Sequence, residues 1–190
     1  MKRFLSISIL LTAFLLITSC MKENCGCDEK MVSYPPVLFQ YEYYNYAWGF
    51  RHHGFMIDAH GNVNGFSQPE NWVSPDSMGF ISKSDLEHNL ALCDTVSTTV
   101  SDLEVQTNYR RIESIRGGKI FDHGQFMADA GTGVLSAWYW NKRIGKYESV
   151  FLMSNGDIFK ENSHPDVKAM VDWLKRIGEK TDRFYWFDGK

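Results

Sequence analysis

Aromatic side chains recur at every second position between residues 39 and 50, with one slip in phase. They are Phe39, Tyr41 and Tyr43, then Tyr44, Tyr46, Trp48 and Phe50. A period of two is typical of a β-strand, because alternate side chains of a strand lie on one face. The slip of one residue predicts a β-bulge near Tyr43 and Tyr44, and a loop there that separates two strands is the alternative.

Two later segments have the pattern of β-hairpins. Residues 54–66 place His60-Gly61-Asn62 between apolar runs, and residues 149–160 place Asn155-Gly156 in the same position. Asn-Gly favours a tight hairpin turn because both residues tolerate a positive φ. We expect two more extended segments at residues 119–129 and 134–141, around a turn at residues 130–133.

Three helices are expected, the first a short one at residues 84–93. The second begins with Ser101 and Glu104, the spacing of a capping box, and continues to Gly117-Gly118. The third has Ser163 as its cap and Pro165 in its first turn. Its apolar stripe consists of Val167, Met170, Val171, Leu174 and Ile177. A closing edge strand is expected at residues 184–187.

Strands that are joined by hairpins, with helices inserted between them, predict an α+β fold. A parallel doubly wound sheet would instead need a crossover helix after nearly every strand. We therefore expect a single domain at residues 37–190, with a mainly antiparallel sheet and about three helices packed on one face. The polar residues 20–36, which end in Pro35-Pro36, are expected to form a tether before it.

Residues 1–19 have the pattern of a secretory signal peptide. Lys2 and Arg3 precede an apolar run from residue 4 to residue 17, which ends at Thr18-Ser19-Cys20. The run is shorter than the about 20 apolar residues that a membrane-spanning helix needs. An ordinary signal peptide with a chance cysteine, or an uncleaved anchor helix, is the alternative.

The segment Ile17-Thr18-Ser19-Cys20 resembles the lipobox of bacterial lipoproteins, in which an aliphatic residue and two small residues precede a cysteine. The resemblance implies cleavage before Cys20, a diacylglyceryl group on its sulfur and acylation of the new amino group. A covalent lipid at Cys20 would anchor the protein to a membrane. No other cofactor is expected.

The residues after Cys20 indicate which membrane is expected. Met21 stands where some Gram-negative inner-membrane lipoproteins have Asp, and Lys22-Glu23 looks like the short export signal of Bacteroidota surface lipoproteins. We expect an outer-membrane location in the cell envelope, facing the periplasm or the surface. The chain also looks like small uncharacterised lipoproteins of Bacteroidota, a group that implies no activity. This wider resemblance adds Cys25-Gly26-Cys27, Gly156-Asp157, Asn162, Pro165 and Trp173-Leu174.

The charge balance argues against a nucleic-acid partner. Without Lys2 and Arg3 the chain has 18 basic residues against 23 acidic ones, a net charge of −5, whereas nucleic-acid binding requires a basic face. Cys25, Cys27 and Cys93 remain after lipidation and allow one disulfide, whose pairing the sequence does not decide. Cys93 continues the apolar stripe of Leu86 and Leu90, which favours a buried thiol.

No catalytic signature is present: the chain lacks a phosphate-binding loop, a His-Glu-x-x-His zinc helix and a Gly-x-Ser-x-Gly elbow. The best chemical cluster is His52, Asp58 and His60, with His123 from a distant strand, as metal ligands or an acid–base set. The structural interpretation is simpler and is favoured, because His60 occupies a turn and Asp58 can accept hydrogen bonds from turn amides. No bound metal is expected.

The aromatic residues are the second candidate site, because exposed rings stack on sugars or form interface hot spots. Most of them are expected on the inner face of the sheet. Tyr34 and Tyr139 are expected to be exposed. We therefore predict a membrane-anchored envelope lipoprotein that binds a protein or glycan partner and is not an enzyme. The alternatives are an envelope hydrolase or metal-dependent enzyme, and an immunity or inhibitor protein that blocks a secreted enzyme.

Overall fold

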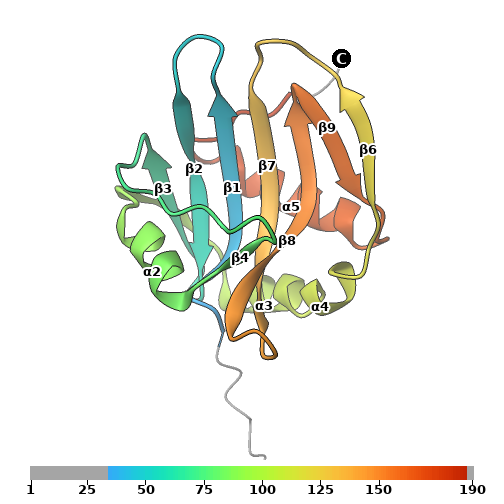
Figure 1. Cartoon of the computed structure of the whole chain (residues 1–190). Coiled ribbons are helices and arrows are strands. Elements are labelled where there is room, and N and C mark those ends of the chain that lie inside the picture. Colours follow the sequence, from blue (N-terminus) through green and yellow to red (C-terminus); the bar gives the residue numbers. More distant parts are fainter. Residues whose placement is uncertain (1–33, 188–190) are drawn as a thin grey trace, which may run out of the picture. The chain divides into compact units, whose positions relative to one another are not determined.

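A nine-stranded sheet forms the frame of the computed structural model, which describes residues 34–187 (Figure 1). The strands pair in the order β5-β3-β2-β1-β7-β8-β9-β6, and β4 pairs with β8. All of these pairings are antiparallel. The strands are β1 (Val37–Asn45), β2 (Arg51–Asp58), β3 (Asn62–Ser67), β4 (Phe80–Ile81), β5 (Thr95–Thr99), β6 (Ile120–Gln125), β7 (Thr132–Asn141), β8 (Lys146–Gly156) and β9 (Ile158–Asn162).

Helices cover both faces of this sheet. The helices α3 (Asp102–Tyr109), α4 (Ile112–Ile115) and α5 (Val167–Gly178) pack with Phe39, Tyr41 and other residues in one core cluster. Met56 and Trp138 point to the other face, where they form a second cluster with Leu86 of α2 (Lys83–Ala91). The predicted α+β class, with a mainly antiparallel sheet in a single domain, is confirmed. The prediction that the helices pack on one face is wrong for α2, because Leu86 of this helix packs with Met56 and Trp138 on the other face.

The strap, residues 68–81, crosses the second face. It leaves β3 and ends in β4, which pairs with β8, so it passes over β2, β1 and β7 (Figure 1). The ring of Trp72 packs on Phe66 at 4.4 Å between centroids. The Asn89 side chain accepts a hydrogen bond from the Val73 N–H at 2.9 Å and donates one to the Val73 carbonyl at 2.7 Å. These contacts fix the middle of the strap above the sheet.

The predicted β-bulge at Tyr43 and Tyr44 is wrong. The pairing of β1 with β2 runs without interruption from Phe39 to Asn45, and its one irregularity lies between Val37 and Phe39. Residues 46–50 are not part of either strand but connect β1 to β2. The alternative, a loop between two strands, is confirmed, although the loop begins two residues after Tyr44.

The other predicted strands agree with the structure in most respects. The hairpin turns fall after Asp58 and at Gly156, whose φ of 114° suits glycine. The segments at 119–129 and 134–141 contain β6 and β7, but β6 pairs with β9 at the edge of the sheet. The short strands β4 and β5 were not predicted, and residues 184–187 form no strand.

The predicted helix ends are partly wrong. The second helix breaks at residues 110–111 into α3 and α4. The Ser101 hydroxyl accepts a hydrogen bond from the Glu104 N–H, as a capping box requires. The Glu104 carboxylate instead accepts one from the Trp173 indole N–H. Ser163 does not cap α5, which begins at Val167, because its hydroxyl accepts from the Lys119 N–H.

The predicted signal peptide, the lipid site at Cys20 and the thiols of Cys25 and Cys27 lie outside the described residues. Cys93 is half-buried against the second cluster, as the sequence predicted, and burial raises the pKa of its thiol to about 12. Within residues 34–187, none of the helices has the length and apolar character to cross a membrane.

Candidate functional site

The four residues of the predicted metal or acid–base cluster lie in separate places. His52 is near the start of β2, whereas Asp58 ends this strand and His60 lies in the turn that follows. His123 is on β6, and β1, β7, β8 and β9 lie between β2 and β6 in the sheet. The structure therefore does not bring these residues into one site. Among residues 34–187 no group of three or more His, Cys, Asp or Glu side chains could hold a metal ion.

Asp58 organises the turn between β2 and β3. Its carboxylate accepts hydrogen bonds from the His60 N–H at 2.8 Å, the Asn62 N–H at 2.9 Å and the Asn62 side-chain amide at 2.8 Å. The residue is 9% exposed. A buried carboxylate that accepts several amide hydrogen bonds is well satisfied. The favoured structural interpretation of Asp58 agrees with these contacts.

We expect Asp58→Ala to lower the free energy of unfolding by about 2 kcal/mol, because the turn amides lose a charged acceptor and are left partly buried. His60→Ala serves as the control, since its side chain is exposed, and should change stability by less than about 0.5 kcal/mol. Urea denaturation measures both. Equal effects of the two substitutions would refute this role of Asp58.

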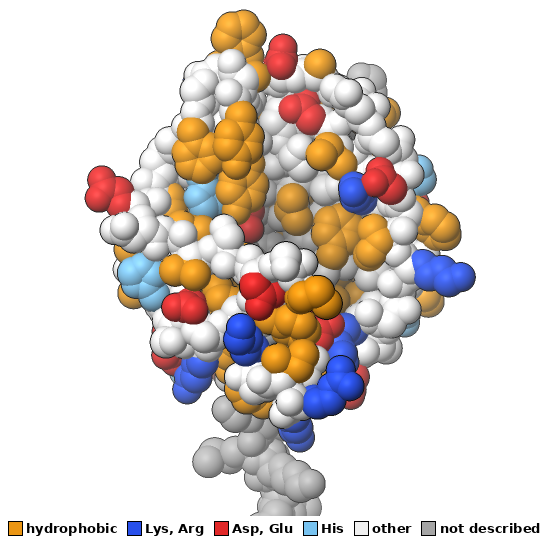
Figure 2. Space-filling view, viewed as in Figure 1, with side chains coloured by type: hydrophobic (Ala, Val, Ile, Leu, Met, Phe, Trp, Pro, Cys, Tyr) orange, Lys and Arg blue, Asp and Glu red, His pale blue; other side chains and the backbone are white. Residues whose placement is uncertain are grey.

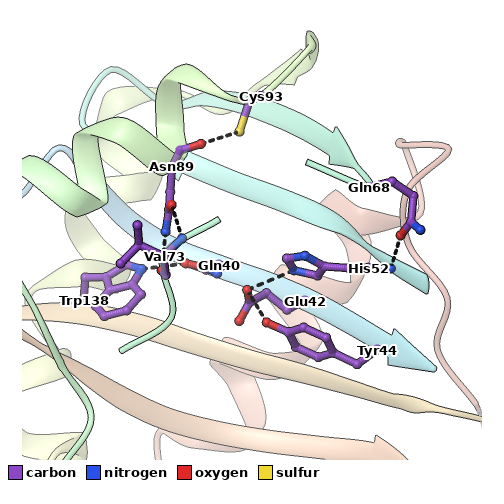
Figure 3. Close-up of polar contacts among 9 residues, drawn as sticks. All are labelled: Gln40, Glu42, Tyr44, His52, Gln68, Val73, Asn89, Cys93 and Trp138. Carbon is purple, nitrogen blue, oxygen red and sulfur yellow. Dashed lines mark hydrogen bonds and ion pairs between the residues drawn. The ribbon is translucent and has the colours of Figure 1, made fainter. Parts of the chain in front are cut away.

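His52 belongs to a polar cluster on the same face as the strap (Figure 3). Its Nε2 lies 3.2 Å from Oε1 of Glu42, and the Tyr44 hydroxyl donates to the same oxygen at 2.7 Å. The Tyr44 ring stacks on the His52 ring at 4.5 Å. Burial, and then the charge of Glu42, raise the pKa of Tyr44, so its hydroxyl stays protonated. The cluster thus holds one half-buried carboxylate against the His52 ring and the hydroxyl donor of Tyr44.

Tyr34 and Tyr139 are only partly exposed, so the prediction that they stand free on the surface is wrong. Tyr34 packs edge-on against Tyr109 of α3 at 5.5 Å. The Tyr139 hydroxyl donates to Glu113 at 3.2 Å, and the guanidinium of Arg116 lies 4.8 Å from its ring centroid. Both rings are covered by the α3–α4 segment, which the sequence pattern did not place over them.

The aromatic loop, residues 46–50, is the most exposed aromatic segment beside a pocket. Tyr46, Trp48 and Phe50 are 75%, 77% and 52% exposed. The loop joins β1 to β2 at one end of the sheet (Figure 1), and Figure 2 shows hydrophobic side chains gathered over this hairpin. The alternation of aromatic residues predicts a strand here, with a loop as the alternative. Asn45 and Gly49, which are typical turn residues, were the signal for a loop.

Two pockets share the aromatic loop. The front pocket, of about 700 Å³, opens on the face that Figure 2 shows hollowed beside the hairpin. It is lined by Tyr44, Asn45, Tyr46, Ala47, Ser74, Asp129, Gly131, Thr132, Asp157 and Ile158. The arginine pocket, of about 430 Å³, lies between the loop, the end of β3 and residues 182–185. It is lined by Tyr43, Trp48, Gly49, Phe50, Arg51, His53, Ser67, Gln68, Asp182, Arg183 and Tyr185. Both volumes are in the range of small-molecule sites.

The charged residues that line the arginine pocket are two arginines, Arg51 and Arg183, and one carboxylate, Asp182. Arg183 pairs with Asp94 at 3.3 Å and with Asp182 at 3.4 Å, whereas Arg51 is exposed and forms no ion pair with any described residue. Burial, helped by the charge of Arg183, lowers the pKa of His53 to about 4, so its ring is neutral at pH 7. No local sequence pattern links His53 to Arg183, which lies 130 residues later in the chain.

The front pocket differs from the arginine pocket in its charge. Its carboxylates are Asp129 and Asp157, and the latter accepts hydrogen bonds from the Ala130 and Gly131 N–H groups at 2.9 and 3.0 Å. The Asn45 amide donates to the Asp129 carbonyl at 3.2 Å. The two pockets therefore present opposite charges on the two sides of one loop.

Comparisons with known proteins give no match to a family model, a curated protein or a solved structure.

Proposed function

We propose that the protein is a lipid-anchored lipoprotein of the cell envelope that binds a protein or glycan partner through the aromatic loop. One observation carries the proposal: Tyr46, Trp48 and Phe50 expose most of their rings together on one hairpin between two pockets. Exposed aromatic side chains that gather beside concave surfaces are typical of binding sites, because they bring a large contact area at a low entropic cost.

The envelope location is supported by the sequence at residues 17–20, where the lipobox-like segment ends at Cys20. Acylation of Cys20 would hold the chain on the outer membrane, and the binding domain would follow the tether at residues 20–36. An anchored binding protein of this kind acts by keeping its partner at the membrane. The hydrolase or metal-enzyme alternative receives no support, because His52, Asp58, His60 and His123 lie apart.

A photo-crosslinking experiment tests the proposed site. We expect a photoreactive amino acid at position 48 of the full chain, in the cells that produce it, to crosslink one discrete partner. Position 126 is the matched control, because Phe126 is also an exposed aromatic residue, 57% against 77% for Trp48, and lies on the β6–β7 connection. Crosslinked products are separated by gel and identified by mass spectrometry as protein or glycan conjugates.

The comparison of the two positions decides the result. A discrete product at position 48, but not at position 126, supports the aromatic loop as the binding site. Its loss when Tyr46 and Phe50 are both changed to Ser in the same chain would add to that support. The same products from both positions, or none from position 48, would rule the loop out.

A further inference from the structure

The arginine pocket combines an aromatic wall with a positive charge. Trp48 and Tyr185, which are 77% and 55% exposed, form this wall. Phe50 also lines the pocket, but its ring contacts Tyr46 at 5.2 Å and His52 at 6.1 Å. Aromatic rings of this kind accept another ring, or the flat apolar face of a sugar, by stacking. The pocket therefore suits a ligand that has a planar or ring-shaped body.

The charged side chains beside this wall determine which charge a ring-shaped ligand should carry. Arg183 forms ion pairs with Asp94 and Asp182 through contacts of 3.3 and 3.4 Å, although its buried Nε makes no hydrogen bond to any of residues 34–187. Arg51, one residue from Phe50, keeps its guanidinium exposed and unpaired among the described residues. A guanidinium matches a carboxylate through two parallel hydrogen bonds. A ligand carboxylate would thus find the exposed guanidinium of Arg51 beside the aromatic wall.

His53 adds a neutral polar group at the inner side of the pocket. Its ring stacks on Tyr43 at 4.6 Å and meets the edge of Tyr185 at 4.8 Å. Its Nε2 is buried and has no hydrogen-bond partner among residues 34–187. Buried polar atoms are nearly always paired in folded proteins, so this unpaired nitrogen is unusual.

We infer that the arginine pocket binds a carboxylate-bearing ligand whose carboxylate pairs with Arg51 and whose ring stacks on Trp48. The inference rests on the proposed function, since it uses the same aromatic loop, and it adds the chemical class of the ligand. The carboxylate belongs either to the end of a peptide with an aromatic residue or to an acidic sugar. These sources share the chemistry that the pocket recognises.

Two matched pairs of probes test the inference by calorimetric titration of the full chain in detergent. The first pair is N-acetyl-tryptophan and N-acetyl-tryptophanamide, and the second is phenyl glucuronide and phenyl glucoside. In each pair the first compound carries a carboxylate, and the second is a neutral compound of nearly the same shape. We expect the charged member of one pair to bind about fivefold more tightly, the ratio that one partly exposed ion pair gives. The pair that shows the preference identifies the source of the carboxylate.

Substitutions test whether Arg51 causes the preference for the charged probe. Arg51→Gln should reduce the ratio to about one, since a neutral amide replaces a guanidinium that forms no ion pair with any of residues 34–187. Arg143→Gln is the matched control, an exposed arginine in the β7–β8 turn, and should leave the ratio unchanged. Trp48→Ser should weaken both members of the pair equally, because it removes the stacking surface alone.

The inference is overturned if charged and neutral probes bind equally, if neither binds, or if Arg51→Gln and Arg143→Gln have the same effect. A ratio of one together with weaker binding in Trp48→Ser would reject the carboxylate and leave the aromatic loop as a binding site. Absence of crosslinking at position 48 would instead reject the proposed function, whatever the ratio. The two failures are therefore distinguishable.

Discussion

Replacing Cys20 by Ser is expected to abolish fatty-acid incorporation into the protein completely. The proposed anchor is a thioether on the sulfur of Cys20, and a serine hydroxyl does not replace the thiolate that forms it. Each buried CH₂ contributes about 0.8 kcal/mol to membrane binding, so several acyl chains hold a protein firmly whereas one chain binds only reversibly. Without the lipid, cleavage before residue 20 should also fail.

Metabolic labelling with an alkyne fatty acid, followed by mass spectrometry of the N-terminus, measures both effects. The natural chain should carry the label and begin at Cys20, and Cys20→Ser should carry none and keep residues 1–19. Cys25→Ser is the matched control, because it makes the same chemical change five residues later and should keep the label. A natural chain that begins at Met1, or that has an unmodified thiol at Cys20, would contradict the envelope assignment.

The sequence predicted the parts of the fold that depend on local patterns. Turns at Gly61 and Gly156 were found because glycine at a positive φ leaves a clear signal, and both have a positive φ in the structure, 77° and 114°. The apolar stripe of α5 was found because its period follows one helix face, and its residues are all buried. Local patterns of this kind can be recognised without knowing the tertiary contacts of the segment.

Long-range partners were not predictable in the same way. Glu104 and Ser163 were assigned to helix caps, which are local motifs, yet Glu104 contacts Trp173 and Ser163 contacts Lys119. The pairing of β6 with β9 skips the nearer β7. No residue pattern within a single segment encodes such contacts, because they depend on how distant elements are placed in the tertiary structure.

In the candidate site, too, local sequence patterns were predictive but long-range contacts were not. The phase slip after Tyr43 predicts either a bulge within a strand or a loop, and the bulge would place Tyr46, Trp48 and Phe50 on the sheet. The structure instead ends β1 at Asn45 and exposes the three rings. The arginine pocket joins Arg51 and His53 to Arg183, more than a hundred residues later in the chain. Only the tertiary structure brings these groups together.

Trp173 is the residue through which α5 is joined to both the sheet and α3. It is 4% exposed, and its ring meets the Phe39 ring edge-on at 4.9 Å. Its indole N–H donates to Glu104 at 2.6 Å. A buried indole that donates to a carboxylate combines a large apolar contact with a charge-assisted hydrogen bond. Its removal should therefore affect more than one element.

We expect Trp173→Ala to lower the free energy of unfolding by about 4 kcal/mol, because it leaves a large cavity. Trp173→Phe keeps most of the apolar contact and loses only the hydrogen bond, so we expect about 1.5 kcal/mol. Trp48→Ala, at a residue 77% exposed, is the control and should change stability by less than about 0.5 kcal/mol. Urea denaturation of the detergent-solubilised chain gives all three values. If Trp173→Ala destabilised the protein no more than Trp48→Ala, Trp173 would not join these elements, and the packing of α5 against Phe39 and Glu104 would have to be abandoned.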